Sequence, residues 1–454
     1  MKPILFFLAF SFAFLTGAQA EFKYEWKAGA AGTVITPDQP IFMAGYGSRN
    51  SPSEGTESDL FAKALFLDAA DGGRGLMITL DVVGIDKAFA DDLCARIEKE
   101  HSIRRNEIAI CTSHTHSGPV IGKNLGPLHY WTLDKNQQQV IDAYEETLKV
   151  KIVATVKKAI SSAVPARIQS GNGKSTFAVN RRTNKPYSEV PDKRARGKLV
   201  GPVDHDVPVL TARDKNDKLI SILFGYACHA TVLGLNFFNG DYPGYAQAEL
   251  ENLNPGATAL FWAGCGGDQN PLPRSEVALA KEYGAELAEA VTEVITAPMT
   301  ELSPSLKTEF KTIEAPLAAV PTKEQILTNS KSTNKYEVAR AGYLLRKMEK
   351  QGGLKGSYPY PVGHWKIGGL YKGQHIDFIF LGGEVVVDYA LRLKKEGSGS
   401  NTWVAGYAND VMAYIPSLRV LKEGGYEGGG SNVYYGLPSL WAESIEEDII
   451  KAAK

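Results

Sequence analysis

Short apolar runs alternate with helical patterns along most of the chain. Short, mainly apolar runs bounded by polar residues predict strands, and apolar residues repeated every three or four positions predict helices. The predicted strands are residues 64–67, 76–83, 106–111, 207–212, 220–227, 258–263, 376–381 and 402–407, and the predicted helices are residues 86–97, 140–160, 277–295 and 323–350, with a last one from residue 439. Asp86 is the expected N-cap of the first helix. This alternation predicts an α/β fold, in which helices flank a mixed or largely parallel sheet.

The segment 297–321 breaks this pattern. It contains four prolines and has no clear hydrophobic period, which is typical of a connection between structural units. We therefore expect one large domain over residues 21–454, with two candidate lobes, 21–296 and 322–454, joined by this segment.

The first twenty residues have the organisation of a secretory signal peptide. Lys2 precedes an apolar run from Ile4 to Leu15, and residues 17–20 read Gly-Ala-Gln-Ala, which is an A-x-A cleavage pattern. We expect cleavage after Ala20 and a secreted or periplasmic mature protein. No later apolar stretch is long enough to span a bilayer, so we expect no transmembrane segment in the mature chain.

Composition narrows the function classes. The chain has 454 residues, with 50 Lys and Arg against 51 Asp and Glu, and this balance argues against a nucleic-acid binder, which needs a concentrated basic surface. The 44% hydrophobic content excludes long disordered regions. Export would permit one or two disulfides, but Cys94, Cys111, Cys228 and Cys265 are too few for a disulfide scaffold, and the sequence leaves their pairing open.

The most informative motif follows the predicted strand at 106–111. Residues 111–119 read C-T-S-H-T-H-S-G-P. Residues i and i+2 of an extended segment face the same way, so His114 and His116 can converge on one point, and neutral imidazole is a good zinc ligand. The alternative is a pair of surface or hydrogen-bonded histidines.

Two further candidates also lie where predicted strands end. His229 follows the strand at 220–227, and Glu384 follows the strand at 376–381 after two glycines. Two histidines and one carboxylate are the protein ligands of many hydrolytic zinc sites, which leave a position for water. These residues predict a hydrolytic zinc site at the strand ends, where α/β folds place their sites.

Three aspartates near these motifs have less specific interpretations. Asp81, after a predicted strand, is either a residue that orients a zinc histidine or a helix cap. Asp241 and Asp268 are interpreted as carboxylates that organise loops rather than as catalytic groups.

These motifs resemble the neutral ceramidase family, the secreted zinc amidases that cut the N-acyl bond of ceramide. Residues 112–119 are similar to its T-H-T-H-S-G-P signature, with Ser113 in place of the first-listed Thr or Ala. The resemblance runs in order from about residue 28 to residue 431 and includes the segments 35–37, 43–46, 60–64, 228–231, 241–246, 382–384, 406–414 and 426–429.

Carried over residue by residue, the resemblance implies one zinc ion per chain. The implied ligands are His114, His229, Glu384 and Tyr414. It also implies that His116 lies beside the metal-bound water and the substrate carbonyl. Arg181 resembles the active-site arginine of the family, and Tyr426, twelve residues after Tyr414, resembles its second active-site tyrosine.

Two departures from the family pattern matter. The family has an active-site serine in a G-D-V-S-P segment, whereas residues 267–271 read G-D-Q-N-P and place Asn270 at that position. Asparagine has no nucleophilic hydroxyl, which excludes an acyl-serine step there, but it can donate a hydrogen bond to a carbonyl oxygen. In addition, the chain ends soon after the tyrosine segment, so we expect the catalytic domain without the C-terminal β-sandwich of the family.

The predicted function is hydrolysis of an N-acyl amide by metal-activated water without a serine nucleophile. The expected roles are general acid for His116 and oxyanion stabilisation by the metal with Tyr426, Arg181 or Asn270. A ceramide-like lipid is the first candidate substrate. The alternatives are a sugar or small-molecule deacylase or esterase on the same zinc site, and a metal-containing binding protein without catalysis. The sequence does not indicate an oligomeric state.

Overall fold

The fold consists of four layers, in the order helices, large sheet, small sheet, helices. This computed structural model describes residues 26–369 and 374–454, so the predicted signal peptide lies outside the described residues. Each sheet is covered on both faces, which explains why so many of its strands are apolar on both sides. The predicted α/β class with a mixed sheet flanked by helices is confirmed.

Within the described residues the large sheet has nine strands and is mixed. Its pairs are parallel at β11–β9 and β4–β5 and antiparallel elsewhere. In spatial order the strands are β11 (Thr258–Ala263), β9 (Leu219–Tyr226), β8 (Asp206–Asp214), β6 (Val164–Lys174), β1 (Trp26–Val34), β3 (Phe61–Asp68), β4 (Arg74–Leu80) and β5 (Ile108–Thr112), with β13 (Thr300–Leu302) paired to β6.

The small sheet packs on one face of the large sheet. Its strands are β14 (Leu306–Pro316), β15 (Ser357–Gly368), β16 (His375–Leu381) and β18 (Thr402–Ala405). Aromatic rings fill the space between the sheets, and the ring of Trp262 lies 4.9 Å from that of Phe378. Strands β13 and β14 occupy most of the segment 297–321, for which the sequence predicts a connection between two lobes. The division into two lobes stays a prediction.

Helices cover the two outer faces. In the described ranges they are α1 (Lys87–His101), α2 (Lys135–Ser161), α4 (Asp241–Leu253) and α5 (Val277–Thr296) over the large sheet, α8 (Asp388–Glu396) and α11 (Ile445–Ala453) over the small sheet, and α3 (Val190–Ala195), α6 (Lys323–Asn329), α7 (Lys335–Gln351), α9 (Leu418–Glu423) and α10 (Asn432–Tyr435) at the periphery. The single helix expected over 323–350 is two helices, because Asn334 caps a new start through a 2.9 Å bond from the backbone N–H of Tyr336. Asp86 caps α1 as expected.

The two sheets are joined where several of their strands end. Isolated bridges connect Cys111 to Ala408 and Gly264 to Ala405. Short strand pairs lie beside them: β7 (Ala178–Asn180) with β12 (Gln269–Pro271), and β17 (Glu384–Val385) with β19 (Tyr414–Ile415); β2 (Gly55–Thr56) pairs with β10 (Phe237–Phe238). The loops that carry the candidate chemistry come together at this junction.

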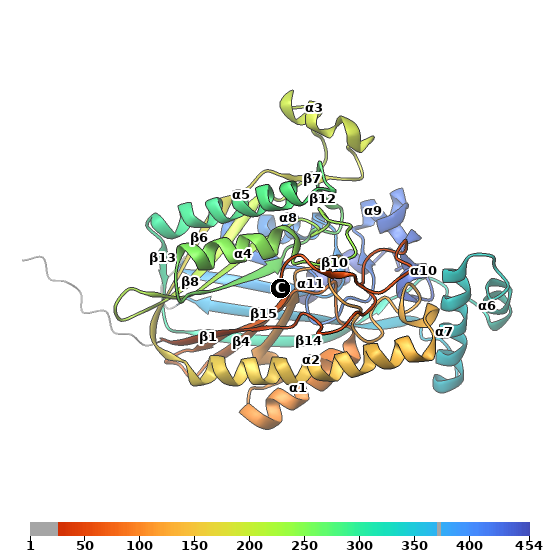
Figure 1. The fold of residues 1–454 in the computed structure, drawn as a ribbon, viewed down its shortest axis with the longest axis horizontal. Helices are drawn as coiled ribbons and strands as arrows, with labels where there is room; N and C mark the ends of the chain where they lie inside the picture. The colour runs from red at the N-terminus through yellow and green to blue at the C-terminus, as the bar shows by residue number, and fades with distance from the viewer. Residues whose placement is uncertain (1–25, 370–373) are drawn as a thin grey trace, which may run out of the picture.

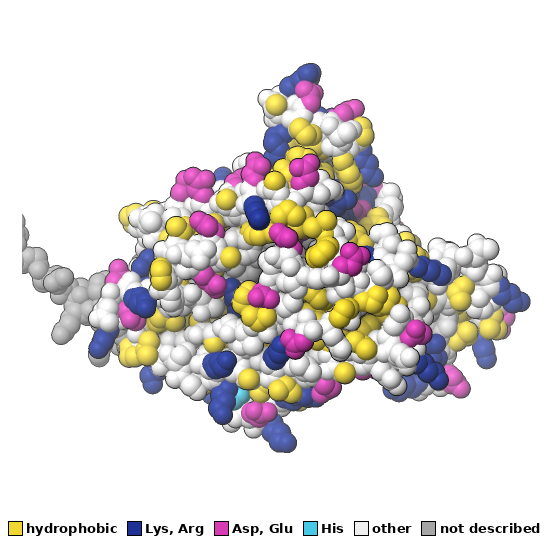
Figure 2. All heavy atoms as spheres, in the orientation of Figure 1, with side chains coloured by type: hydrophobic (Ala, Val, Ile, Leu, Met, Phe, Trp, Pro, Cys, Tyr) yellow, Lys and Arg dark blue, Asp and Glu magenta, His cyan; other side chains and the backbone are white. Residues whose placement is uncertain are grey.

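An arm of residues 181–205, which contains α3, projects from the body next to β7 and β12 (Figure 1). Lys and Arg side chains gather on it (Figure 2). All four cysteines lie within the described ranges and are buried free thiols. Within residues 26–369 and 374–454, no helix combines the length and the apolar character that crossing a membrane would need.

Candidate metal centre

His114 is locked into one tautomer by the loop that follows β5. Its backbone has a left-handed φ of 60°, and its N–H donates to the Val82 carbonyl at 3.1 Å. The ring Nδ1 lies 2.5 Å from the carbonyl oxygen of Val83, which can only accept. Nδ1 therefore carries the proton, and Nε2 keeps a free lone pair for a metal.

His229, just after β9, is fixed in the same way. Its Nδ1 lies 2.7 Å from the carbonyl oxygen of Gly266, so this nitrogen also carries the proton. Burial and, to a lesser extent, the nearby charge of Arg181 lower the pKa of His229 to about 4. His229 is therefore neutral at pH 7, with its Nε2 lone pair available.

Glu384 meets both imidazoles. It begins β17, which pairs in parallel with β19 and places Glu384 opposite Tyr414. Its Oε2 lies 3.1 Å from Nε2 of His114 and 3.0 Å from Nε2 of His229. With both Nδ1 atoms protonated, three lone pairs face one another, and Oε2 receives no hydrogen bond from a described residue. Ligand atoms about 2.1 Å from a tetrahedral zinc ion lie about 3.4 Å apart, so this donor set fits a small divalent cation.

His116 is the third imidazole of the cluster. The ligand nitrogens of His114, His116 and His229 lie within 4.8 Å of one another, so these three side chains could also hold a metal ion. His116 differs from the other two because its buried Nδ1 has no hydrogen-bond partner among the described residues. Metal-ligating histidines almost always donate their second N–H. That rule favours His114, His229 and Glu384 as ligands and leaves His116 beside them.

Arg181 organises the other side of the site. The pairing of β7 with β12 brings it next to Asn270. Its guanidinium donates to Glu427 Oε1 at 2.7 Å, to Asn270 Oδ1 at 3.2 Å and to Tyr414 Oη at 3.0 Å. Tyr414 Oη also lies 3.1 Å from Nε2 of His229. The predicted residues Arg181, Asn270 and Tyr414 thus form one hydrogen-bonded group in contact with the histidines.

Tyr426 is more peripheral than the other predicted residues. Its ring centroid lies 5.3 Å from that of Tyr414, and the residue is 47% exposed. It lines a cleft of about 560 Å³, which His116, His229 and Asn270 also line. The structure thus brings all eight predicted site residues to one place, with Tyr426 at the open side.

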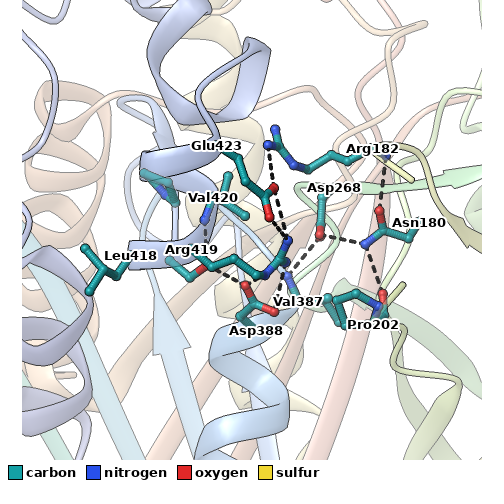
Figure 3. Close-up of polar contacts among 12 residues, drawn as sticks. Asn180, Arg182, Pro202, Asp268, Val387, Asp388, Leu418, Arg419, Val420 and Glu423 are labelled. Carbon is teal, nitrogen blue, oxygen red and sulfur yellow. Dashed lines mark hydrogen bonds and ion pairs between the residues drawn. The ribbon is translucent and has the colours of Figure 1, made fainter. Parts of the chain in front are cut away.

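The three aspartates organise loops. Asp268 accepts from the backbone N–H of Val387 at 3.0 Å and from Asn180 Nδ2 at 2.9 Å, which ties β7 to the start of α8 (Figure 3). Asp241 accepts from backbone N–H groups of the 232–233 turn and of its own helix. For Asp81 both expectations are wrong, because it accepts from the backbone N–H of Phe61 at 2.9 Å instead of touching a histidine or capping a helix.

Two residues of the site escaped the sequence reasoning. Tyr435, in α10, donates through its hydroxyl to Oε1 of Glu384. Glu427 binds Arg181 and also accepts from Arg182 at 2.6 Å. Glu427 lies directly after Tyr426, inside a segment already singled out, whereas no pattern around Tyr435 distinguishes it.

Comparisons with known proteins bear on the family and the fold. The model of the family described as neutral/alkaline non-lysosomal ceramidase, N-terminal, matches residues 27–303. A structure described as a ceramidase complexed with C2 has a TM-score of 0.71 at 18% identity, over 94% of this chain and 74% of that chain. A neutral ceramidase from Pseudomonas aeruginosa has a TM-score of 0.70 at 18% identity, over 95% and 74%. At this identity the two structures support the fold alone. No curated protein sequence matches the chain.

Proposed function

The chain belongs to the neutral/alkaline non-lysosomal ceramidase family, and from this premise we propose that it is a zinc-dependent amidohydrolase that cleaves an N-acyl bond without a serine nucleophile. The family makes it a hydrolase of amides, and the metal, its ligands and the roles of the site residues are parts of the proposal. The pattern of residues 1–20 supports export of the protein.

One observation carries the metal assignment. The proton of each ligand imidazole is held at Nδ1 by a backbone carbonyl, so His114 and His229 present lone pairs to the Glu384 carboxylate. Three buried acceptor atoms facing one another are stable only around a cation. Two imidazoles and a carboxylate suit zinc, and the Tyr414 hydroxyl is the proposed fourth ligand.

A zinc ion held there would lower the pKa of a bound water and polarise the substrate carbonyl. The chain itself supplies the proton transfer. Burial lowers the pKa of His116 well below its usual range, so its resting form is neutral and it acts first as a base. It accepts a proton from the attacking water and then passes that proton to the leaving nitrogen.

Hydrogen-bond donors around the cleft would stabilise the oxyanion. Asn270 Oδ1 is engaged by Arg181, so the amide nitrogen of Asn270 is the group left to donate. Tyr426 offers a phenolic hydroxyl from the open side of the cleft. One such donor typically contributes about 3 kcal/mol to the transition state.

The proposal is tested by metal content and turnover together. The wild-type protein should bind one zinc ion per chain and hydrolyse N-acyl amides. His114→Ala should lose both properties, whereas Asn270→Ala should keep zinc and lose about 100-fold in rate. His375→Ala is the matched control, because this histidine pairs with Asp377 at 3.1 Å away from the cleft.

Two results would count against the proposal. Stoichiometric zinc with full turnover in His114→Ala would exclude the ligand assignment. Zinc without turnover on any acyl amide or ester would favour the metal-containing binding protein instead.

A further inference from the structure

The cleft beside the candidate metal centre is lined by polar, charged and tyrosine side chains. Among the described residues, no Ala, Val, Leu, Ile, Met or Phe lines it; its walls are formed by Gly, Thr, Asn, Tyr, His and charged side chains. A methylene group gains about 0.8 kcal/mol only when it leaves water for an apolar environment. A long acyl chain would therefore find no aliphatic wall in the cleft, whose apolar surface includes the rings of Tyr46, Tyr187, Tyr414 and Tyr426.

Two of the arginines in the cleft are neutralised by glutamates. Arg181 pairs with Glu427 at 2.7 Å, and Arg182 pairs with Glu427 at 2.6 Å and with Glu423 at 2.9 Å (Figure 3 shows the Arg182–Glu423 contact). Two positive and two negative charges cancel in this group. These arginines are therefore not free to bind an anionic ligand.

Two other cations of the cleft have no carboxylate partner within the described part of the chain. The side chain of Arg274 makes a single polar contact, from Nη1 to the Thr231 carbonyl oxygen at 3.5 Å. Asp241 interacts electrostatically with Arg274 but accepts its hydrogen bonds from backbone N–H groups. Lys185 is exposed and lines the same cleft. The cleft thus carries an excess of positive charge.

Both cations lie close in sequence to residues of the site. Lys185 comes four residues after Arg181, where the chain leaves β7, and Arg274 comes four residues after Asn270, where the chain leaves β12. β7 and β12 pair antiparallel, so the chain leaves this pair at opposite ends, and the two cations that follow, Lys185 and Arg274, both line the cleft. A negatively charged group of a substrate would meet these cations while its amide lies at the histidines.

We propose that the cleft binds a small N-acyl compound whose carboxylate contacts Arg274 and Lys185, with an N-acyl amino acid as the substrate class. This inference rests on the proposed amidase function. Hydrolysis breaks the amide C–N bond; the acyl carbon takes the hydroxyl of water and leaves as a carboxylic acid, and the nitrogen takes a proton and leaves as the free amino acid. Arg274 is the principal contact, because a guanidinium binds a carboxylate through two parallel hydrogen bonds.

The test compares three substrates with the zinc-loaded protein: an N-acetyl amino acid, its neutral C-terminal amide and a long-chain ceramide. We expect kcat/KM for the acid to exceed that for the neutral amide by about 10-fold to 100-fold, the effect of one charge-assisted hydrogen bond. An N-succinyl amine, with its carboxylate on the acyl side, should show no such advantage if the anion belongs to the amine side.

Variants test whether Arg274 and Lys185 cause the preference for the acid over the neutral amide. Arg274→Gln should lower the acid-to-amide ratio of kcat/KM by about tenfold or more, mainly through KM, and Arg274→Lys should restore part of it. Lys185→Gln should have a smaller effect in the same direction. Lys198→Gln is the matched control, because Lys198 lies on the same arm but does not line the cleft.

Different results would overturn the amidase function and the carboxylate subsite. If no N-acyl amide is hydrolysed, the proposed function is wrong. If amides are hydrolysed but ceramide or the neutral amide is preferred, or if Arg274→Gln leaves the ratio unchanged, the carboxylate subsite is overturned and the amidase stands. A preference for the N-succinyl amine would overturn the assignment to amino acids.

Discussion

Glu384 and Asp410 are both buried carboxylates, and each lies a few residues after a strand of the small sheet. Tyr435 stands between them: its hydroxyl donates to Glu384, and its side chain lines a second cavity, of about 270 Å³, that Asp410 also lines. Burial raises the pKa of Asp410 to about 8. Glu384 instead faces the Nε2 atoms of His114 and His229, which can share a cation with its carboxylate.

The difference lies in the partners that each carboxylate meets. Oε2 of Glu384 faces two imidazoles that can share a cation with it. Asp410 meets only the Tyr358 hydroxyl, which donates to its Oδ2 at 2.8 Å, and its Oδ1 has no partner among the described residues. A buried carboxylate keeps its charge only where cations or several donors face it. The surroundings of Glu384 therefore suit a bound cation, and those of Asp410 suit a neutral carboxylic acid.

The largest expected effect comes from Glu384→Gln. The change keeps the shape of the side chain and removes the charge that a metal requires. We expect loss of zinc and at least a 1,000-fold fall in kcat, since a catalytic zinc typically needs three protein ligands. Metal analysis and turnover on N-acyl amides measure the two losses.

Asp410→Asn is the matched control, because it makes the same carboxylate-to-amide change on the other side of Tyr435. It should keep zinc and activity at neutral pH. If both amide variants lost zinc to the same extent, the comparison between the two carboxylates would be broken.

Glu427→Gln should have the next largest effect. It removes the shared partner of Arg181 and Arg182, whose side chains are only 13% and 12% exposed. Leaving the largely buried guanidinium of Arg181 without its paired carboxylate should cost about 3 kcal/mol in the free energy of unfolding. Urea denaturation measures this loss.

Glu423→Gln is the control for that pair. Glu423 is 44% exposed and contacts only the Arg182 side of the cluster together with Arg419, so its loss should cost about 0–1 kcal/mol. Equal destabilisation by the two changes would mean that Glu427 has no special role in the cluster.

The elements that sequence predicted well are those with strong local signals. Strand β11 occupies residues 258–263, as predicted, because an unbroken apolar run fits a strand covered on both faces. Strand β1 escaped prediction because it reads W-K-A-G-A-A-G-T-V, with little side-chain bulk. Its small residues suit close packing against α2: a Cβ on Gly29 would lie 2.2 Å from the Ala159 carbonyl oxygen. That requirement is tertiary and leaves no periodic signal.

Strand β15 escaped prediction for another reason. Pro359 and Pro361 normally argue against a central strand. However, residues 357–361 pair only with β14, since β16 pairs with β15 from Val362 onward. A proline there can point its nitrogen to the open side, where no ladder bond is needed.

The site was more predictable than the fold around it. His114, His229 and Glu384 each follow an apolar run that ends abruptly, and the ends of neighbouring strands meet at one edge. Tyr435 could not be found this way, because α10 reaches Glu384 only through the packing of the C-terminal segment. The carbonyls of Val83 and Gly266, which fix the tautomers of His114 and His229, could not be predicted either, because every residue has a backbone carbonyl.

Tyr435→Phe tests whether the hydroxyl of Tyr435, which lies between Glu384 and Asp410, belongs to the metal site. The change removes the hydroxyl that holds Oε1 of Glu384 and leaves the ring in place. Loss of a hydrogen bond that orients a ligand typically weakens metal binding by about 10-fold to 100-fold. Zinc affinity measured by chelator competition should fall by that amount. Tyr434→Phe, the adjacent tyrosine, should leave it unchanged, and an unchanged affinity in Tyr435→Phe would remove Tyr435 from the site.

The smallest expected effect on the site comes from Asp410→Asn, which should alter only the pH dependence of stability. The pKa of Asp410 is raised from 3.8 to about 8, mainly by burial. The charges of Asp86 and Asp91 contribute to the rise, and the Tyr358 hydrogen bond and the charge of Lys87 oppose it. Between these values the folded protein holds a proton that the unfolded chain releases, so the free energy of unfolding should fall as pH rises, by up to about 1.4 kcal/mol per pH unit. Asn keeps an acceptor for Tyr358 and cannot titrate, so urea denaturation from pH 5 to 8 should give the variant a flatter profile. Parallel profiles for the two proteins would mean that Asp410 is already ionised in the fold, and that it resembles Glu384 after all.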